Sequence, residues 1–322
     1  MTLAILVEPH GFVFDLTQQP SRVGGVKQPP PIVHNLLTVE NDKGVWEPQL
    51  ATEQISVERG TWRPNPDGSM DTTWTVRPGV KWHDGSPFTS DDLLFGWQVF
   101  TDPQIPNRQS AITRLMVSAM APDPLTLVVH WSAPSASADQ ALGLTPLPRH
   151  LLEDTYLADK PTFASSPRLS TQFVGLGPYR LLHWEPGSHL EFSRFDAYWR
   201  GRPPLDSVIV RFLGDPNTMV ANILSGAVDV LLAPGVDLEA ALDVKQRWEG
   251  TGHQVLVGLS GNLRVMDPQF RPEYARPRGG LTNTAVRQAL YHAIDRQSIV
   301  DAGSQGLAPI ADSWFRDRKS VV

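Results

Sequence analysis

The chain has no cysteine among its 322 residues. Disulfide bonds, thiolate metal sites and a cysteine nucleophile are therefore excluded, but the compartment is not, because cysteine-free proteins occur on both sides of a membrane. No apolar run reaches the roughly 18 residues that a membrane-spanning helix needs, and no basic segment followed by an apolar core opens the chain. The sequence therefore predicts no membrane span and shows no export signal.

Motifs of the common hydrolases are absent as well. A zincin needs two histidines four positions apart on a helix with a glutamate between them, and no such motif occurs; neither does a G-x-S-x-G nucleophile elbow. The nine histidines are scattered without the spacing of a metal site. We therefore expect no catalysis, no cofactor and no protein-only metal site. The alternative, a hydrolase, would be revealed by turnover of peptide or ester substrates.

Positive charge does not accumulate anywhere in the sequence. The net charge is -6 and the pI is near 5.8, and no cluster of Lys and Arg interrupts this balance, which argues against nucleic-acid binding. What the sequence does contain is a 41% hydrophobic share, 29 prolines and 10 tryptophans. Length and composition together predict two or three globular domains with many loops between short strands.

The clearest local signals lie between Trp74 and Phe100. Alternation of apolar and polar residues predicts strands over residues 73–76 and 80–83. Pro78-Gly79 between them predicts a type II turn, because proline fixes the first φ and glycine accepts the positive second one.

A helix is predicted after a further turn at Asp84-Gly85. Thr89 suits its N-cap and Asp92 its third position, which is a capping-box pattern. Asp91 and Asp92 near His83 also invite a metal or acid–base interpretation, but capping and the helix dipole account for both carboxylates, so we predict that they are structural. The helix should bury one apolar stripe, formed by Leu93, Leu94, Trp97 and Phe100.

The segments around this stretch read as β-structure with one further helix. Residues 53–75 predict an antiparallel meander that turns at residues 66–68. Residues 112–120 predict a helix, and residues 125–131 predict a buried strand.

The second half of the chain reads as α/β structure. Strands are predicted over residues 207–212 and from Asp229 onward, on either side of a helix that starts at Asp215 and ends before Gly226. Strand, helix and strand joined by short links are typical of an α/β lobe. Residues 286–294 predict a second, amphipathic helix.

The stretch from Trp74 resembles the signature of the family 5 extracellular solute-binding proteins, the dipeptide, oligopeptide and nickel binders that feed ABC importers. The family pattern is an aromatic residue, an Arg, a turn, a Lys-aromatic pair, Asp-Gly, a Pro and a helix opening with Ser/Thr-acid-Asp. The matching residues are Trp74, Arg77, Gly79, Val80, Lys81, His83, Asp84, Gly85, Pro87, Thr89, Asp91 and Asp92.

Three further segments resemble the family in the family's order. Gly175 to Tyr179 stands where the family has Gly-Thr-Gly-Pro-Tyr, with Leu176 in place of the usual Thr. Leu224 to Asp229 is similar to Leu-x-Gly-x-x-Asp, in which we expect the Asp to anchor structure rather than to contact ligand. Val286 to Arg296 is similar to the family's amphipathic helix.

The resemblance implies an α/β fold of the type II periplasmic-binding-protein kind, with two lobes, an α+β subdomain inserted in the first lobe and a truncated second lobe. Residues 1–42 and 173–257 would form the first lobe, residues 43–172 the inserted subdomain, and residues 258–316 the start of the second lobe. Residues 317–322 equal the translation of a common sequencing-adapter sequence. We therefore expect a non-native tail on a fragment of a longer protein.

The resemblance also implies a function. The protein would capture a peptide or similar small solute in the periplasm or at the outer face of the cytoplasmic membrane, as a monomer, and deliver it to the permease of an ABC transporter. The ligand would act by favouring the closed arrangement of the lobes. The alternatives are a ligand-sensing domain of a transcription regulator, which an upstream helix-turn-helix would favour, and a binder of a nickel chelate or other small solute.

Four residues are candidates for lining the first-lobe half of the binding site, on the implied topology and on residue type: Asn35, Arg108, Gly177 and Trp184. Trp184 offers an aromatic wall, Arg108 a partner for a carboxylate, and Gly177 close backbone approach. Asn35 is also suited to a hydrogen-bonding turn. Arg149 has two interpretations too, a fork for a ligand carboxylate or a surface ion pair.

Overall fold

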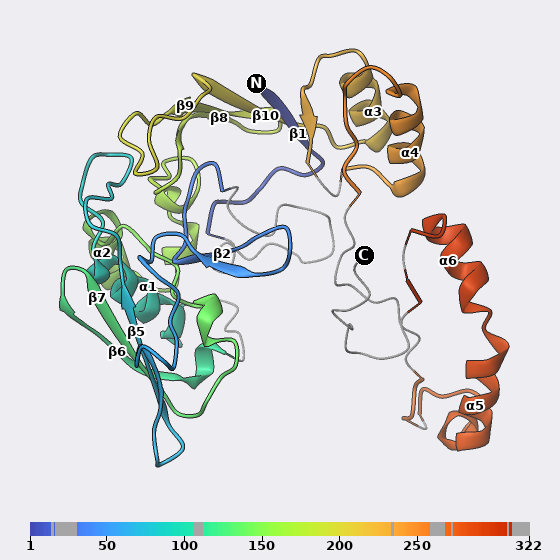
Figure 1. Ribbon diagram of the computed structural model, residues 1–322, viewed down its shortest axis with the longest axis horizontal. Helices are drawn as coiled ribbons and strands as arrows, with labels where there is room; N and C mark the ends of the chain where they lie inside the picture. Colours follow the sequence, from blue (N-terminus) through green and yellow to red (C-terminus); the bar gives the residue numbers. More distant parts are fainter. Residues whose placement is uncertain are drawn as a thin grey trace. The chain divides into compact units, whose positions relative to one another are not determined.

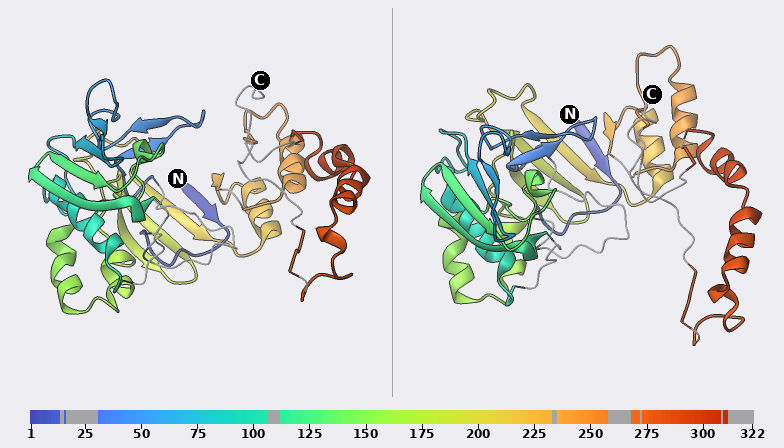
Figure 2. Two further views of the ribbon diagram at one scale, coloured as in Figure 1. Left: turned by 90° about the horizontal axis from the view of Figure 1, so that it is seen from below. Right: turned by 60° about the horizontal axis from the view of Figure 1, so that its bottom comes forward.

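The computed structural model describes residues 1–13, 16, 31–105, 112–232, 235–257, 268–271, 273–307 and 309–310. The chain forms two compact units, Met1–Asp237 and Leu238–Val322, and each is described by itself. Figures 1 and 2 show their elements from three directions.

Five strands of the first unit form a mixed sheet in the order β11-β1-β10-β9-β8 (Figure 1). Strand β1 lies between β10 and β11 and is parallel to both, whereas β9 is antiparallel to both of its neighbours. Three of the four residues of β1 are buried, as expected of an apolar strand between two parallel neighbours. The strands are β1 (Thr2–Ile5), β8 (Tyr179–Glu185), β9 (His189–Arg194), β10 (Ser207–Phe212) and β11 (Val230–Leu231).

Helix α3 (Pro216–Leu224) joins β10 to β11 and confirms the predicted strand, helix and strand. Asp215 is its N-cap, with Oδ1 accepting a hydrogen bond from the Thr218 N–H at 2.8 Å, and Pro216 follows at the first helical position. Gly226 has a φ of 75°, the left-handed conformation that often follows a helix end.

Asp229, just before β11, ties the segment after α3 to β1. Its Oδ2 accepts a hydrogen bond from the Thr2 N–H at 2.6 Å, and its own N–H donates to the Thr2 carbonyl at 2.8 Å. The prediction that this family-motif aspartate anchors structure is confirmed.

A second, antiparallel sheet has the order β4-β5-β7-β6, and β2 pairs with β3 as a separate ribbon. These six strands lie between β1 and β8 in the sequence. The strands are β2 (Thr38–Glu40), β3 (Trp46–Pro48), β4 (Trp62–Pro64), β5 (Met70–Thr75), β6 (Met116–Asp123) and β7 (Thr126–Trp131). The meander predicted before Trp74 and the buried strand predicted at residues 125–131 are confirmed.

Two predictions in this part of the chain are wrong. Residues 112–120 contain only a short 3-10 turn, Thr113–Leu115, before β6 begins, because pairing with β7 outweighs the local helical pattern. Residues 80–83 form no strand, only an isolated bridge between Lys81 and Pro87. The two turns are where they were predicted, with φ of 77° at Gly79 and 93° at Gly85.

Helix α1 (Ser90–Thr101) packs against β6 and β7 and touches α2 (Arg149–Ala158) (Figures 1 and 2). The predicted stripe is only partly right, because α1 is buried on two faces. Leu93, Leu94 and Trp97 pack in the core under the antiparallel sheet. Phe95, Val99 and Phe100 pack in the core of the mixed sheet. The helix therefore belongs to both cores, which one stripe could not indicate.

The second unit contains α4 (Leu238–Arg247), α5 (Thr284–Ala293) and α6 (Arg296–Ser304). The predicted amphipathic helix is α5, and Asp295 caps α6 by accepting a hydrogen bond from the Ser298 N–H at 3.0 Å. Neither α5 nor α6 has a buried residue, and Val286 and Leu290 on the apolar stripe of α5 are 39% and 45% exposed. Within the described ranges, no helix is both long and apolar enough to cross a membrane.

Candidate functional site

Asn35 is fully buried, with 1% of its surface exposed. Its Oδ1 accepts hydrogen bonds from the Tyr198 hydroxyl and the Trp199 indole N–H, both at 3.0 Å, and its Nδ2 donates to the His34 carbonyl at 3.3 Å. The carbonyl oxygen has only two lone pairs, so it is fully used by these two donors. Asn35 therefore holds the loop at residues 198–199, and its part in a solute site stays a prediction.

Gly177 lies against the backbone of residues 32–34. Its N–H donates to the Val33 carbonyl at 3.1 Å. A Cβ added at Gly177 would stand 2.4 Å from the Val33 carbonyl carbon and 2.6 Å from the His34 nitrogen. This glycine makes its close backbone approach to another segment of the chain, residues 32–34.

Two buried histidines hold the loop that contains Gly177. His83 Nδ1 accepts a hydrogen bond from the Gly175 N–H at 3.1 Å, and its Nε2 donates to the Gly177 carbonyl at 3.0 Å. His34 Nδ1 accepts from the Leu176 N–H at 3.3 Å. Because a backbone N–H can only donate, both Nδ1 atoms must be unprotonated acceptors. Burial lowers the pKa of His83 to about 4 and that of His34 to about 3, so both imidazoles are neutral.

Trp184 lies on β8 and packs against the core of the mixed sheet. Its ring meets Phe12 edge to face with centroids 5.5 Å apart, and its indole N–H donates to Glu8 Oε1 at 2.7 Å. The other oxygen of Glu8 accepts from the Gly187 N–H at 2.9 Å, so one carboxylate holds both the tryptophan and the turn after it. Nothing local in the sequence marks Glu8 as a partner of Trp184, because the two residues lie more than 170 positions apart.

The structure brings two of the four predicted site residues together. Gly177 contacts residues 32–34, and Asn35 is the next residue in the sequence, whereas no hydrogen bond or ring contact among the described residues joins Trp184 to either. Arg108 lies outside the described residues. The four-residue half-site therefore remains a prediction.

Trp184→Phe separates the packing of this residue from its hydrogen bond. The variant keeps an aromatic ring against Phe12 but loses the indole N–H, and we expect the free energy of unfolding to fall by about 1 kcal/mol, since the bond to Glu8 is half exposed. Urea denaturation checks this. A loss as large as that of Trp184→Ala would contradict this expectation, because it would mean that the aromatic ring against Phe12 contributes nothing to stability.

Asp92 does more than the predicted capping. Its Oδ2 accepts hydrogen bonds from the Thr89 N–H at 3.0 Å and the Trp82 indole N–H at 3.1 Å, and its Oδ1 accepts from the Arg149 N–H at 3.0 Å. Arg149 is the first residue of α2, so one carboxylate satisfies N–H groups at the start of two helices. Burial raises the pKa of Asp92, while these three donors favour its charged form.

Asp92→Asn is expected to lower the free energy of unfolding by about 2 kcal/mol, because an amide cannot accept all three bonds without turning its NH₂ toward a donor. Asp91→Asn is the matched control. The Asp91 side chain is half exposed and its nearest cation, Arg149, is 3.9 Å away, so its loss should cost a few tenths of a kcal/mol at most. Equal losses measured by thermal denaturation would contradict the two-helix role.

Arg149 and Asp84 are both engaged with other side chains. Arg149 forms a surface ion pair with Glu153 one turn along α2, through Nε at 2.9 Å and Nη2 at 2.8 Å. This is the second of its two predicted roles. Asp84 accepts from His150 Nε2 at 2.7 Å and from the Ser86 N–H at 2.9 Å. Asp84 thus serves turn geometry, whereas His83 holds the loop that contains Gly177.

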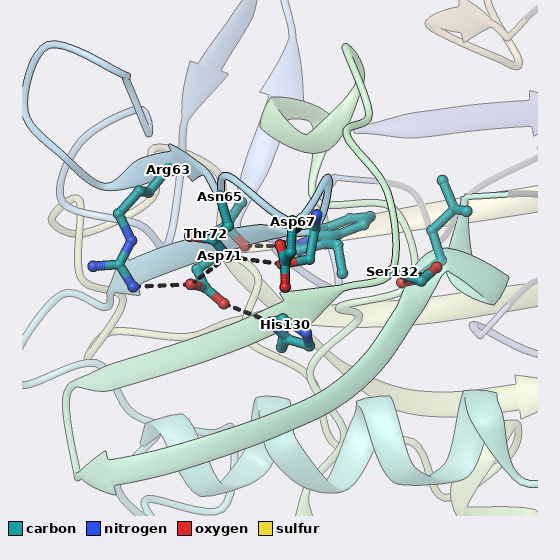
Figure 3. Close-up of polar contacts among 10 residues, drawn as sticks. Arg63, Asn65, Asp67, Asp71, Thr72, His130 and Ser132 are labelled. Carbon is teal, nitrogen blue, oxygen red and sulfur yellow. Dashed lines mark hydrogen bonds and ion pairs between the residues drawn. The ribbon is translucent and has the colours of Figure 1, made fainter.

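A polar ladder crosses the exposed face of the antiparallel sheet (Figure 3). Asp71 accepts hydrogen bonds from Arg63 at 2.9 Å, Asn65 at 3.0 Å and His130 Nδ1 at 2.8 Å, and these donors, Arg63 first, lower its pKa to about 2. The His–Asp pair resembles part of a hydrolase triad, but Ser132 donates its hydroxyl to the Leu115 carbonyl. Within the described residues, no group of three His, Asp or Glu side chains is placed to hold a metal ion.

The second unit has an open hollow of about 500 Å³ at the end of α4, lined in part by Leu242, Trp248, His253 and Leu256. The Trp248 and His253 rings lie 4.9 Å apart. Of the predicted site residues within the described ranges, Asn35, Gly177 and Trp184, none lines this hollow.

A mixed sheet with parallel strands at its centre, a helix between β10 and β11 and an antiparallel sheet inserted between β1 and β8 define the class of α/β periplasmic-type binding proteins. The chain belongs to the bacterial extracellular solute-binding proteins, family 5. The model of this family, described as "Bacterial extracellular solute-binding proteins, family 5 Middle", matches residues 46–318. The family resemblance seen in the sequence is confirmed.

Two curated relatives show how far the likeness extends. Heme-binding protein A of Haemophilus influenzae is 26% identical over an alignment of 264 residues that covers 76% of this chain and 46% of that protein. Oligopeptide-binding protein AppA of Bacillus subtilis is 24% identical over 247 residues, which are 76% of this chain and 43% of that protein. The chain spans about half the length of the curated relatives it matches.

Solved structures show the same fold. AppA from Bacillus subtilis in complex with a nonapeptide matches with a TM-score of 0.68 and 21% identity, over 97% of this chain and 56% of that one. NikZ from Campylobacter jejuni in complex with Ni(L-His) matches with a TM-score of 0.68 and 21% identity, over 97% and 57%. HbpA2 from Haemophilus parasuis matches with a TM-score of 0.69 and 20% identity, over 99% and 61%. The predicted type II periplasmic-binding-protein fold is confirmed.

Proposed function

We propose that this protein captures a small solute of the peptide type outside the cytoplasmic membrane and delivers it to an ABC permease. The observation that carries the proposal is the family match over residues 46–318. An oligopeptide-binding protein among the relatives and a nonapeptide complex among the solved structures support a peptide as the solute. The protein acts by binding and release, without catalysis and as a monomer.

The proposal assigns residues 1–42 and 173–257 to the first lobe, residues 43–172 to the inserted subdomain and residues 258–316 to the start of the second lobe. Asn35, Arg108, Gly177 and Trp184 are its candidates for the first-lobe half of the solute site. The contacts of Asn35 and Gly177 favour a structural role, in which they hold the loops beneath a site, over direct contact with the ligand.

A heme or a nickel chelate is the second candidate solute. The relative named Heme-binding protein A and the NikZ complex with Ni(L-His) favour it. Both are planar or compact chelates that a cleft lined by aromatic residues would accept.

The test is a binding experiment on the purified 322-residue chain. A mixed pool of short peptides, Ni(L-His) and heme are each added while the unfolding midpoint is followed, and any hit is titrated by calorimetry. We expect the peptide pool to raise the midpoint by a few degrees at about a hundredfold excess over Kd. A response to heme or Ni(L-His) alone would favour the second candidate. Turnover of peptide or ester substrates would overturn the proposal.

A further inference from the structure

Two arginines stack on one tryptophan at the surface of the first unit. The Cζ atom of Arg77 lies 4.8 Å from the centroid of the Trp199 ring, and that of Arg200 lies 4.7 Å from it. We call Arg77, Trp199 and Arg200 the Arg–Trp–Arg cluster. A hydrogen bond holds the Trp199 ring in place, because its indole N–H donates to the buried Asn35 side chain.

The cluster carries positive charge that no carboxylate of the described residues neutralises. Arg77 uses its Nε on the Gln49 carbonyl at 2.7 Å, and Arg200 makes no ion pair or hydrogen bond within the described ranges. The nearest acid in sequence, Asp196, is already taken, since its Oδ1 accepts from Arg194 at 2.8 Å and from Arg202 at 3.1 Å. Two guanidinium groups therefore share a small area in a protein whose net charge is -6.

Within the described ranges, no hydrogen bond occupies the terminal N–H groups of Arg77 or any side-chain N–H group of Arg200. A guanidinium lying on an aromatic face keeps its in-plane N–H donors, and these match the two oxygens of a carboxylate. Because both guanidinium groups already lie over the ring, less side-chain freedom is lost when an acceptor binds. An ion pair within the chain would have occupied these N–H groups, as the pairs with Asp196 do at Arg194 and Arg202.

We propose that the Arg–Trp–Arg cluster is a docking site for acidic side chains of a protein partner. Arg200 is exposed, and a single exposed ion pair binds weakly, so a free small anion would occupy the cluster only at high concentration. An acidic segment that places two or more carboxylates at once gains from effective concentration. The inference does not depend on which solute the protein carries.

The test uses the Trp199 indole N–H resonance of the full chain, assigned by its loss in Trp199→Phe. A hexaglutamate peptide is titrated against a matched hexaglutamine peptide. We expect the glutamate peptide alone to shift this resonance in a saturable way, and Arg200→Gln to weaken the apparent affinity by about fivefold. Added salt at a few tenths molar should abolish the shift.

Arg202→Gln is the matched control. It removes an equal charge two residues from Arg200, and Arg202 is already paired with Asp196. It should leave the affinity within about twofold of the unmodified chain. No shift with hexaglutamate, or equal weakening by Arg200→Gln and Arg202→Gln, overturns the proposal. Inorganic phosphate shifting the resonance as strongly as hexaglutamate at equal charge would also overturn it, because the site would then bind an adventitious ion only.

Discussion

Gly177→Ala is expected to lower the free energy of unfolding by about 3 kcal/mol or more. The new Cβ would stand 2.4 Å from the Val33 carbonyl carbon, 2.6 Å from the His34 nitrogen and 2.7 Å from the Ile32 carbonyl oxygen. All three are backbone atoms, so no rotamer change relieves the clash. The loop must instead move away and break its bonds to Val33 and His83, which is an overpacking cost of about 3 kcal/mol.

The control for this prediction is Gly214→Ala, at a position where an added Cβ meets nothing within 4 Å. This variant should be neutral or slightly stabilising, because it only reduces the freedom of the unfolded chain. Urea denaturation of both variants measures the difference. A loss below about 1 kcal/mol for Gly177→Ala would mean that the segment at residues 32–34 yields easily, and that the loop is not held as described.

The sequence predicted what is local in this region and missed what is distant. A glycine at position 177 predicted close approach to another backbone, but nothing near it identified Val33 as the partner. The same holds for Asp92, where the capping pattern with Thr89 was readable and the bond to the Arg149 N–H was not. Turns and caps are set by neighbouring residues, whereas these contacts depend on tertiary packing.

The predictions that failed were made from the spacing of apolar residues alone, without knowledge of the elements that pack against them. Residues 112–120 have apolar spacing compatible with a helix, but β7 offers backbone partners along β6, with two register shifts, and strand preference is decided by such partners. For α1, one apolar stripe was expected and two faces are buried, since the helix lies between two cores. The solute-site residues were predicted from the implied topology and not from a local motif. The sequence therefore supports them less strongly than it supports the turns and caps.

Acidification should destabilise the protein well before its carboxylates titrate. An unfolded histidine has a pKa of 6.5, whereas burial lowers the pKa of His83 to about 4 and that of His34 to about 3. Between pH 6.5 and 4 the unfolded chain therefore binds protons that the folded chain excludes, and stability falls as the pH falls through this window. Arg180 lowers the pKa of His83 further and Asp84 raises it, but burial is the largest cause. Each histidine should remove about 3 kcal/mol by pH 4.

The slope of unfolding free energy against pH gives the decisive measurement. Near pH 5.5 we expect a slope close to two protons, about 2.5 kcal/mol per pH unit, from these two histidines beyond any other contribution. His83→Asn and His34→Gln should each lower the starting stability and reduce the slope by about one proton. His183→Gln is the control, because that side chain is 54% exposed and lies outside the loop, so the slope should not change.

Asp71 does not contribute to the slope between pH 6.5 and 4. Its pKa is about 2 in the folded chain and 3.8 in the unfolded chain, so its contribution to stability is lost only at lower pH. A slope unchanged in both loop variants would show that the imidazoles take up protons without releasing Gly175, Leu176 and Gly177, and that the two histidines do not hold the loop as neutral acceptors.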